Sequence, residues 1–287
     1  MIIFFSDGRL GNQIFQYSFL KTISKKNETI VCSNMKSLFD TLDFDKKRIF
    51  HNSNRHLGFF FIKVVSPLIL YPLCKLRIIN YVEQKKDINF RPLPEWHEQR
   101  GILPFLRYVS SDFFQSETFF DRTVLSELHI KEKYIAEARQ FVSSVPKNYE
   151  KVFVHIRRGD YLKESFEGER GIDLPKSYFN KAINIIKKEI DAPFFIFLSD
   201  DTSYVESCFK EVKPKIISKN SREVDLAIMT ICEAGIISNS SYSWWGAYLM
   251  RIRRKIIAPK YWYGWKKKVE SHIGIQPTFS EVIEFTE

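Results

Sequence analysis

The stretch VFVHIRRGD, residues 152–160, begins as a run of mainly apolar side chains and ends in two arginines, a glycine and an aspartate. An apolar run of this length is typical of a buried strand, which we place at 152–156. Similar short runs follow it, and segments with helical periodicity separate them. The strands are expected at 194–198, 215–217, 235–237 and 255–257, and the helices at 176–190, 202–210, 222–233 and 243–251. This alternation predicts an α/β fold with a mostly parallel, doubly wound sheet.

The first half of the chain begins like a second α/β unit. IIFF (2–5) reads as a buried strand, and the turn SDGRLGNQ (6–13) leads into a helix. A further strand is expected at 29–33, whereas residues 35–110 show no clear period and are predicted to be irregular. Helical periodicity resumes at 126–142, and VPKNYEK (145–151) reads as a linker. We therefore expect two lobes, residues 1–147 and 148–287.

Size and composition agree with two folded lobes. The chain has 287 residues, of which 44% are hydrophobic and 15% aromatic, which is enough to build substantial cores and argues against disorder. The formal net charge of +10 favours an anionic partner: nucleotide phosphates, an anionic membrane surface or nucleic acid. The four cysteines are widely spaced, which indicates neither a zinc site nor a disulfide framework. We expect a reducing, cytoplasmic location.

Two segments bear on whether the protein contacts a membrane. The N-terminus lacks the basic and apolar regions of a signal peptide. The run from Leu57 to Leu73 is more membrane-like, but Lys63, Pro67 and Pro72 interrupt it, and a spanning helix needs about 20 apolar residues. We expect a soluble protein, with peripheral contact to the inner face of the membrane as an alternative.

Polar clusters follow three of the expected strands, and ligands of such sheets bind at the carboxyl ends of strands. The clusters are HIRRGDY (155–161), SDD (199–201) and SNSSYSWW (238–245). Arg157 and Arg158 point in different directions on an extended backbone, and a guanidinium fork matches two phosphate oxygens. The alternative is a structural ion pair with Asp160. Together the three clusters favour an anion site.

The other two clusters carry alternatives of their own. The serines from Ser238 to Ser241 precede a helix, so they form either an anion site at its positive end or an ordinary N-cap. Asp200 and Asp201 either accept hydrogen bonds from a base or ribose or cap the next helix. Of Trp244 and Trp245, one is expected in the core and the other beside the site. No metal ligands are expected.

The first turn of the chain holds Gly8, Gly11, Asn12 and Gln13, and glycines let a backbone approach a ligand closely. The spacing G-x-x-G-N-Q differs from the dinucleotide fingerprint G-x-G-x-x-G, and no acidic residue closes a second strand about 20 residues later. A Rossmann dehydrogenase is therefore disfavoured.

Three segments carry a family resemblance: GRLGNQIFQY (8–17), HIRRGDY (155–161) and SNSSYSWWGAYL (238–249). In order and spacing they resemble the α-1,2-fucosyltransferases of glycosyltransferase family 11, over nearly the whole chain. The resemblance implies a GT-B fold of two facing Rossmann-like lobes, GDP-β-L-fucose as donor, a terminal galactose as acceptor, inversion at the anomeric carbon and no required metal.

The resemblance also implies roles for individual residues. Arg157 would contact the β-phosphate, and His155 with Asp200 or Asp201 would lie near the nucleoside. The turn of Asn239, Ser240 and Ser241 would bind phosphate, with Arg158 as a second or structural cation. Residues Gly8 to Gln13 would face the reaction centre from the other lobe. Inversion needs a general base, for which Asp160, Glu164 and Asp7 are candidates.

Other functions fit the sequence less well. A transferase of the same fold with another nucleotide sugar or another fucosyl linkage is the nearest alternative. A nucleic-acid-binding protein is suggested by the basic charge and by YWYGWKKK (261–268), but the charge is spread along the chain without a recognition motif, so no nucleic-acid partner is expected. A non-catalytic lectin would need aromatic platforms but no diphosphate site.

Overall fold

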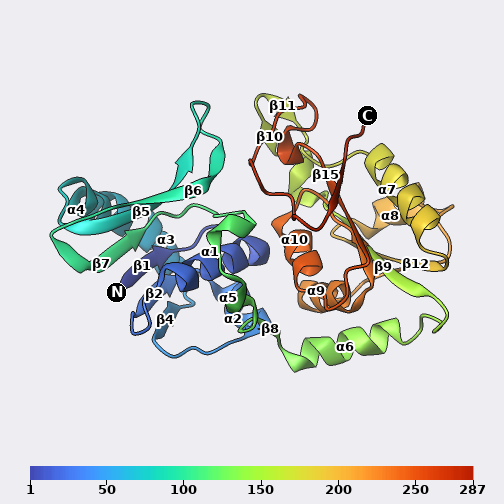
Figure 1. Cartoon of the computed structure of the whole chain (residues 1–287), viewed down its shortest axis with the longest axis horizontal. Helices are drawn as coiled ribbons and strands as arrows, with labels where there is room; N and C mark the ends of the chain where they lie inside the picture. The colour runs from blue at the N-terminus through green and yellow to red at the C-terminus, as the bar shows by residue number, and fades with distance from the viewer. Residues whose placement is uncertain (287) are drawn as a thin grey trace. The chain divides into compact units, whose positions relative to one another are not determined.

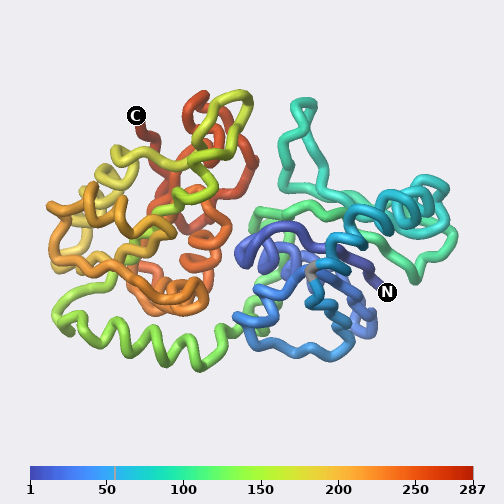
Figure 2. The backbone as a smooth tube through the Cα atoms, turned by 180° about the vertical axis from the view of Figure 1, so that it is seen from behind, coloured from blue at the N-terminus to red at the C-terminus, as the bar shows by residue number. Residues whose placement is uncertain are grey.

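The computed structural model describes residues 1–286 and divides into two compact units, Met1–His129 and Ile130–Glu287 (Figures 1 and 2). Each unit contains one six-stranded sheet. The division falls earlier than the expected boundary between residues 147 and 148. The reason is that helix α6 (Glu132–Val142) packs against α9 (Arg222–Ile231) and so belongs to the second unit.

The sheet of the second unit is parallel throughout, in the order β13-β12-β9-β14-β15-β16. The chain enters at a central strand, moves outward to one edge, and then returns to build the other side. The direction of strand order therefore reverses between β9 and β14, which is where open α/β sheets bind ligands. The strands are β9 (Glu150–Ile156), β12 (Pro193–Ser199), β13 (Lys215–Ile217), β14 (Ala234–Ile236), β15 (Lys255–Pro259) and β16 (Glu281–Ile283).

Helices cover this sheet because its strands are apolar on both faces. Val154, Phe197 and Ile236 are fully buried and form one core with Tyr178 and Ile183 of α7. The hydroxyl of Tyr178 donates to the carbonyl oxygen of Ile237 at 2.6 Å, so α7 is also tied to the end of β14. The helices that alternate with the strands are α7 (Lys176–Glu189), α8 (Thr202–Cys208), α9 and α10 (Ser241–Tyr248). The expected order of elements from residue 150 onward is thus observed, with β16 added.

The sheet of the first unit has the order β4-β2-β1-β7-β5-β6 and is parallel except for the pairing of β5 with β6. The hairpin of β5 and β6 projects from the unit (Figure 1). Here too the strand order reverses, between β1 and β7. The strands are β1 (Ile2–Phe5), β2 (Ile30–Ser33), β4 (Ile49–Asn52), β5 (Ile79–Lys86), β6 (Pro92–Gln99) and β7 (Leu103–Val109). The predicted α/β class with mostly parallel sheets is confirmed.

The expectation that residues 35–110 are irregular is wrong. Besides β4 to β7, the segment contains α2 (Lys36–Thr41), β3 (Leu42–Asp43) and a continuous helical rod. The rod is made of α3 (Arg55–Phe60), the π-helix η1 (Phe61–Leu70) and α4 (Tyr71–Lys75), and it continues through Pro67. Its packing on the sheet outweighs the local signal of the proline. Within the described residues, the helix His56–Lys75 is long and apolar enough to cross a membrane by length and composition, with 17% of its apolar window buried.

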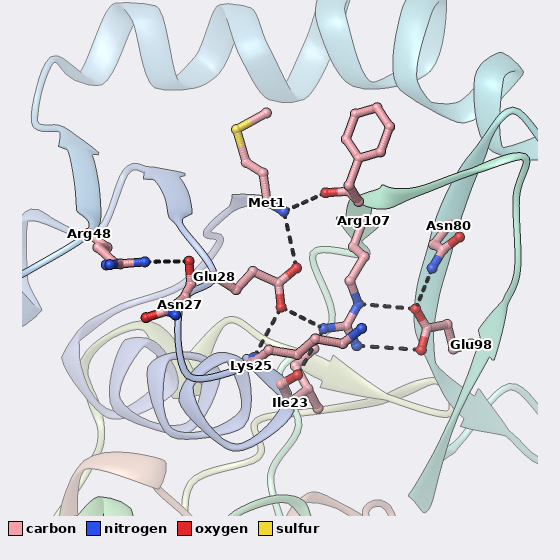
Figure 3. Close-up of polar contacts among 10 residues, drawn as sticks. Met1, Ile23, Lys25, Asn27, Glu28, Arg48, Asn80, Glu98 and Arg107 are labelled. Carbon is pink, nitrogen blue, oxygen red and sulfur yellow. Dashed lines mark hydrogen bonds and ion pairs between the residues drawn. The ribbon is translucent and has the colours of Figure 1, made fainter.

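A buried arginine fastens the first sheet at its amino end (Figure 3). Arg107 of β7 is 6% exposed and lies 3.1 Å from Glu28 and 3.0 Å from Glu98 of β6. Glu28 precedes β2 and also accepts from the N-terminal ammonium at 3.1 Å. Because each charge has a partner, burial of the cluster is tolerated, and it holds β1, β2, β6 and β7 together.

Short elements complete the fold: α1 (Leu10–Ile23), η2 (Glu117–Phe119), α5 (Arg122–Leu125), β8 (His129–Ile130), η3 (Gly159–Leu162), β10 (Ser165–Phe166), β11 (Glu169–Arg170) and η4 (Trp262–Gly264). Of these, α1 and η3 lie where a ligand is expected to bind, because they follow β1 and β9, the strands at which the order of each sheet reverses.

Candidate functional site

The ends of β9 and β14 meet where the strand order of the second sheet reverses. Nδ1 of His155, near the end of β9, lies 2.8 Å from the hydroxyl oxygen of Ser238, which follows β14. The His155 side chain is buried, and burial lowers its pKa to about 3. The ring is therefore neutral at physiological pH, and its hydrogen bond joins the end of β9 to the loop after β14 without a charge.

Arg157 lies between two carboxylates at the end of β9. Its Nη1 is 2.7 Å from Oδ2 of Asp200, its Nη2 donates to Oδ1 of Asp160, and its guanidinium lies over the ring of Tyr161. Burial disfavours the charged form, but Asp200 and Asp160 outweigh it and raise the pKa of Arg157. A guanidinium has five N–H donors, so these two carboxylate contacts leave donors for the oxygens of a ligand. The result is a permanent, oriented cation.

Arg158 points to a different set of partners. Its Nη1 lies 2.9 Å from Asp173 and its Nε lies 3.3 Å from Asp201. The guanidinium also stacks 3.7 Å from the ring centroid of Tyr204. Each of the two predicted arginines thus has two carboxylate partners and one aromatic ring, but the partners of Arg158 are not those of Arg157.

The two neighbouring aspartates, Asp200 and Asp201, also have different roles. Oδ1 of Asp200 accepts from the backbone N–H of Arg158 at 2.9 Å. The same carboxylate therefore contacts the side chain of Arg157 and the backbone of Arg158. That position depends on Gly159, where an added Cβ would lie only 2.5 Å from Oδ2 of Asp200. Oδ1 of Asp201 instead accepts from the backbone N–H of Tyr204 at 3.0 Å and caps α8.

The serine turn after β14 both caps a helix and faces the same edge of the sheet. Ser240 is the N-cap of α10 and accepts from the backbone N–H of Tyr242 at 3.4 Å, and Ser241 is the first helical residue. Asn239 is fully buried, and its Nδ2 donates to the carbonyl oxygen of Ile172 at 2.6 Å, so its side chain supports the loop. The positive end of α10 therefore lies at Ser240 and Ser241.

The expectation that one of the paired tryptophans lines the site is wrong, because Trp244 and Trp245 are both fully buried. Trp244 donates from Nε1 to the carbonyl oxygen of Ile275 at 2.6 Å and stacks on Tyr248. The pair therefore anchors α10 in the core and fixes the direction of its N-terminus.

In the first unit, two glutamines hold the loop that follows β1. Nε2 of Gln13 donates to the carbonyl oxygens of Gly8 and Asn34, and its Oε1 accepts from the backbone N–H of Leu38. Gln16 likewise bridges the carbonyl oxygens of Asp7 and Asp112, each at 3.1 Å. Gln13 was predicted to bind a ligand, but its side-chain amide makes its hydrogen bonds to the protein backbone.

The other predicted residues of this loop differ in position. Gly8 has a φ of +93°, and an added Cβ would lie 2.5 Å from Nδ2 of Asn12. Gly11 is buried within α1, whereas Asn12 is half-buried and accepts from Gln115 at 2.6 Å. Asp7 is exposed, and its Oδ1 accepts from the backbone N–H of Gly8 at 2.8 Å. Asp7, Gly8 and Asn12 therefore form the polar end of β1.

Of the candidate general bases, Asp160 is engaged by Arg157, whereas Glu164 is exposed just beyond η3. Glu164 and Asp160 belong to the second unit and Asp7 to the first.

The sequence did not single out one half-buried carboxyl, which lies in the helix that follows β13. Asp225, in the first turn of α9, accepts from the hydroxyl of Ser218, which follows β13. Burial raises the pKa of Asp225 to about 7. The ring of Tyr242 lies 5.3 Å from that of His155, and the pKa of Tyr242 is raised by burial and by Asp225. In the sequence, Asp225 resembles any acidic residue that favours a helix N-terminus.

Neither a possible metal site nor a cavity found in the first unit involves the site residues described above. Within residues 1–286, no group of three or more His, Cys, Asp or Glu side chains could hold a metal ion. A cavity of about 280 Å³ has Ile30 and Ile49, the first residues of β2 and β4, in its wall. It lies at the amino end of the sheet, whereas ligands of such folds bind at the carboxyl end.

Comparison with known proteins supports the resemblance. The family model for glycosyl transferase family 11 matches residues 4–273. The O-antigen biosynthesis glycosyltransferase WbnK of Escherichia coli is 26% identical, over 91% of this chain and 94% of that protein. The alpha-1,2-colitosyltransferase of Escherichia coli is 28% identical, over 89% and 90%. The galactoside 2-alpha-L-fucosyltransferase Sec1 of Mus musculus is 22% identical, over 84% and 62%.

Among solved structures, POFUT1 in complex with GDP is similar in fold. The TM-score is 0.55 at 15% identity, and the match covers 90% of this chain and 97% of that chain.

Proposed function

This chain belongs to glycosyl transferase family 11, and we propose that it transfers L-fucose from GDP-β-L-fucose to the 2-hydroxyl of a terminal galactose, with inversion at the anomeric carbon. Its fold is of the GT-B type, in common with fucosyltransferases. The observation that carries the proposal is the position of Arg157. Asp160 and Asp200 orient it at the end of β9, and the serine turn follows β14, the neighbouring strand at the point where strand order reverses.

The diphosphate of the donor binds Arg157 and the turn of Ser240 and Ser241. Negative charge develops on the leaving diphosphate as the bond between the fucose anomeric carbon and its oxygen breaks. A fixed guanidinium and the positive end of α10 stabilise that charge more than they stabilise the bound donor. Arg158 keeps the loop in place through Asp173 and Asp201 rather than contacting phosphate.

The nucleoside binds at the neighbouring strand ends, near His155, Tyr242 and Asp225. Guanine presents adjacent N–H donors at N1 and N2, and an ionised carboxylate is an acceptor for both. Asp225 is half-buried at this edge and is the group we assign to that role. Burial raises the pKa of Asp225, and Glu223 adds to this effect; two hydrogen bonds donated by a base would favour the ionised carboxylate.

The acceptor hydroxyl attacks the anomeric carbon and passes its proton to a general base. Asp160 is paired with Arg157, so we assign it to positioning the arginine. Asp7 and Glu164 are the two remaining candidate bases, and Asn12 is a candidate contact to the acceptor sugar.

A second donor is favoured by one comparison. The alpha-1,2-colitosyltransferase of Escherichia coli is 28% identical to this chain. Colitose is L-fucose without its 3-hydroxyl, so both sugars suit one diphosphate site. A site that hydrogen-bonds the 3-hydroxyl would reject colitose strongly, by a factor of about 10⁴ or more, because its polar groups would be left unpaired.

A donor screen tests the proposal. The purified protein is incubated with lactose and, in turn, GDP-fucose, GDP-colitose, GDP-mannose and UDP-galactose, and release of the nucleoside diphosphate is measured. We expect GDP-fucose to be consumed and two-dimensional NMR to locate the new α linkage at O2 of galactose. Preference for GDP-colitose would select the second candidate. Transfer from UDP-galactose alone, or to another hydroxyl, would contradict the proposal.

A further inference from the structure

The helical rod His56–Lys75 packs on the sheet of the first unit with only one of its faces. Phe61, Ile62 and Val65 belong to the same apolar cluster as Phe5 and Tyr108 of the sheet. Phe61 stacks on Phe5 with ring centroids 5.2 Å apart. In Figure 2 the rod runs along one side of this unit. Because this packing completes a core, the rod cannot leave the sheet to span a bilayer without uncovering apolar surface.

The opposite face of the rod is apolar and exposed. We call it the outer face; its large side chains recur every three or four residues and form one stripe, made of Leu57, Phe60, Val64 and Leu68. Phe60 is 49% exposed and Leu68 is 71% exposed. Single exposed apolar residues need no explanation, but a contiguous stripe marks an interaction surface.

The charged residues of the rod and of the chain segments that flank it have one sign. No Asp or Glu occurs between Lys46 and Val82, whereas Lys63 lies on an exposed part of the rod, and Lys75 and Arg77 lie at its end. Long cationic side chains place their stems on apolar surface and their heads in a polar layer. Apolar residues interleaved with cations match the boundary between acyl chains and anionic headgroups.

A second copy of this chain is a poorer occupant. A symmetric pairing through the outer face would bring the cations of both copies together without any acidic partner from this segment. We propose instead that the outer face docks the protein on an anionic lipid bilayer, with the rod lying in the plane of the interface. The outer face shares no residue with the candidate site, so the proposal holds whichever sugar the enzyme transfers.

Vesicle sedimentation with the full chain tests the proposal. Sucrose-loaded vesicles of phosphatidylcholine alone are compared with vesicles that contain about 30 mol% phosphatidylglycerol. We expect sedimentation with the anionic vesicles only, and release as salt is raised from about 0.1 M to about 0.5 M. Absence of binding to the anionic vesicles would overturn the proposal.

Matched variants locate the binding surface. Phe60→Gln combined with Leu68→Gln should lower the partition coefficient on the order of tenfold, because two apolar contacts with the bilayer are lost. The control combines Phe105→Gln with Ile252→Gln, two apolar residues that are 61% and 57% exposed and lie outside the rod. The control should bind as the unchanged protein does, and an equal loss in both variants would contradict docking through the outer face.

Two further readouts separate docking from misfolding and from self-association. Lys63→Gln should weaken binding to the anionic vesicles roughly fivefold, since one cation near the surface is removed, while the melting temperature stays unchanged. Light scattering without lipid should show the same mass for the unchanged protein and the Phe60→Gln, Leu68→Gln variant. A dimer that this variant converts to a monomer would assign the face to a second copy and overturn the proposal.

Discussion

Asp200 places Oδ2 2.7 Å from Nη1 of Arg157, which connects the ends of the adjacent strands β12 and β9. The other oxygen, Oδ1, accepts from the backbone N–H of Arg158. One carboxylate thus fixes both the guanidinium of Arg157 and the backbone that carries it. We assign Arg157 to the diphosphate of the donor, which is the leaving group. Asp200 therefore sets the direction of the cation that stabilises the leaving group.

Gly159→Ala should disturb this relationship without changing any charge. The added methyl would lie 2.5 Å from Oδ2 of Asp200, the oxygen that pairs with Arg157, so the carboxylate must shift. We expect turnover to fall by roughly tenfold or more, since a small displacement at a reacting centre is costly.

The double variant Gly159→Ala, Asp200→Ala gives the control for this interpretation. If the methyl acts by displacing Asp200, adding it to the Asp200→Ala protein should have little further effect on turnover. Fully additive losses would mean that Gly159 acts in some other way.

Arg158→Ala should mainly reduce stability. The change leaves Asp173 and Asp201 without their shared cation and removes the stacking on Tyr204. Loss of such charged hydrogen bonds in a partly buried cluster costs roughly 2 kcal/mol, and calorimetry should show a melting temperature lower by roughly 4–8 °C. GDP binding by the remaining folded protein should change little. A large loss of GDP affinity at unchanged stability would instead assign Arg158 to the diphosphate.

Asp225→Asn should change the pH dependence of stability. Burial raises the pKa of Asp225 to about 7 in the folded protein, whereas an exposed Asp titrates near 4. Between these values the folded state binds more protons than the unfolded state, so stability falls as pH rises through this window. The variant lacks the titration, and its melting temperature relative to the unchanged protein should therefore rise from about pH 5 to about pH 8. A difference that is constant with pH would refute this assignment.

The same variant tests the role proposed for Asp225 in nucleoside binding. If the ionised carboxylate accepts from guanine, the unchanged protein must release a proton to bind, and its affinity for GDP should fall as pH is lowered through about 7. Asp225→Asn should bind GDP more weakly and with less dependence on pH, as calorimetric titration would show. Identical pH profiles in the two proteins would exclude this contact.

Chelation should leave turnover unchanged. The charge on the leaving diphosphate is assigned to Arg157 and the positive end of α10, so excess EDTA should remove nothing that the reaction needs. Measuring GDP release before and after dialysis against EDTA checks this. A loss of turnover that Mg²⁺ or Mn²⁺ restores would show that a metal takes part.

The second unit could be predicted well because its local signals agree. Short apolar strands such as 152–156 alternate with amphipathic helices, and the observed bounds of β9, Glu150–Ile156, differ little from that range. The polar ends of β9, β12 and β14 could be grouped in advance because parallel strands bring their carboxyl ends to one edge. The short strand Glu281–Ile283 was missed because three residues carry too weak a pattern.

The first unit could be predicted less well because tertiary packing overrides local signals there. Pro67 reads as a helix breaker, yet the rod continues through it because Phe61 and Val65 complete a core on the sheet. Strand β6 contains Pro92 and Pro94, which are tolerated because β6 is an edge strand.

Long-range partners explain what the sequence could not show of the site. The arginines were expected as a pair, but only the fold reveals that Asp173 joins Arg158 while Asp200 joins Arg157. Likewise, Asp225 differs from an ordinary helix N-terminal acid only through its burial beside Ser218.

The most direct test of the central claim is the turnover of Arg157→Ala with GDP-fucose and a β-galactoside, measured beside the unchanged protein and with the fold checked by circular dichroism. Loss of one positioned donor to a developing negative charge should lower kcat by about 100- to 1,000-fold. The variant should keep its folded spectrum, because Arg157 lies at the end of a strand whose core residues are untouched. Normal turnover in the folded Arg157→Ala protein would contradict the assignment of the diphosphate to this site.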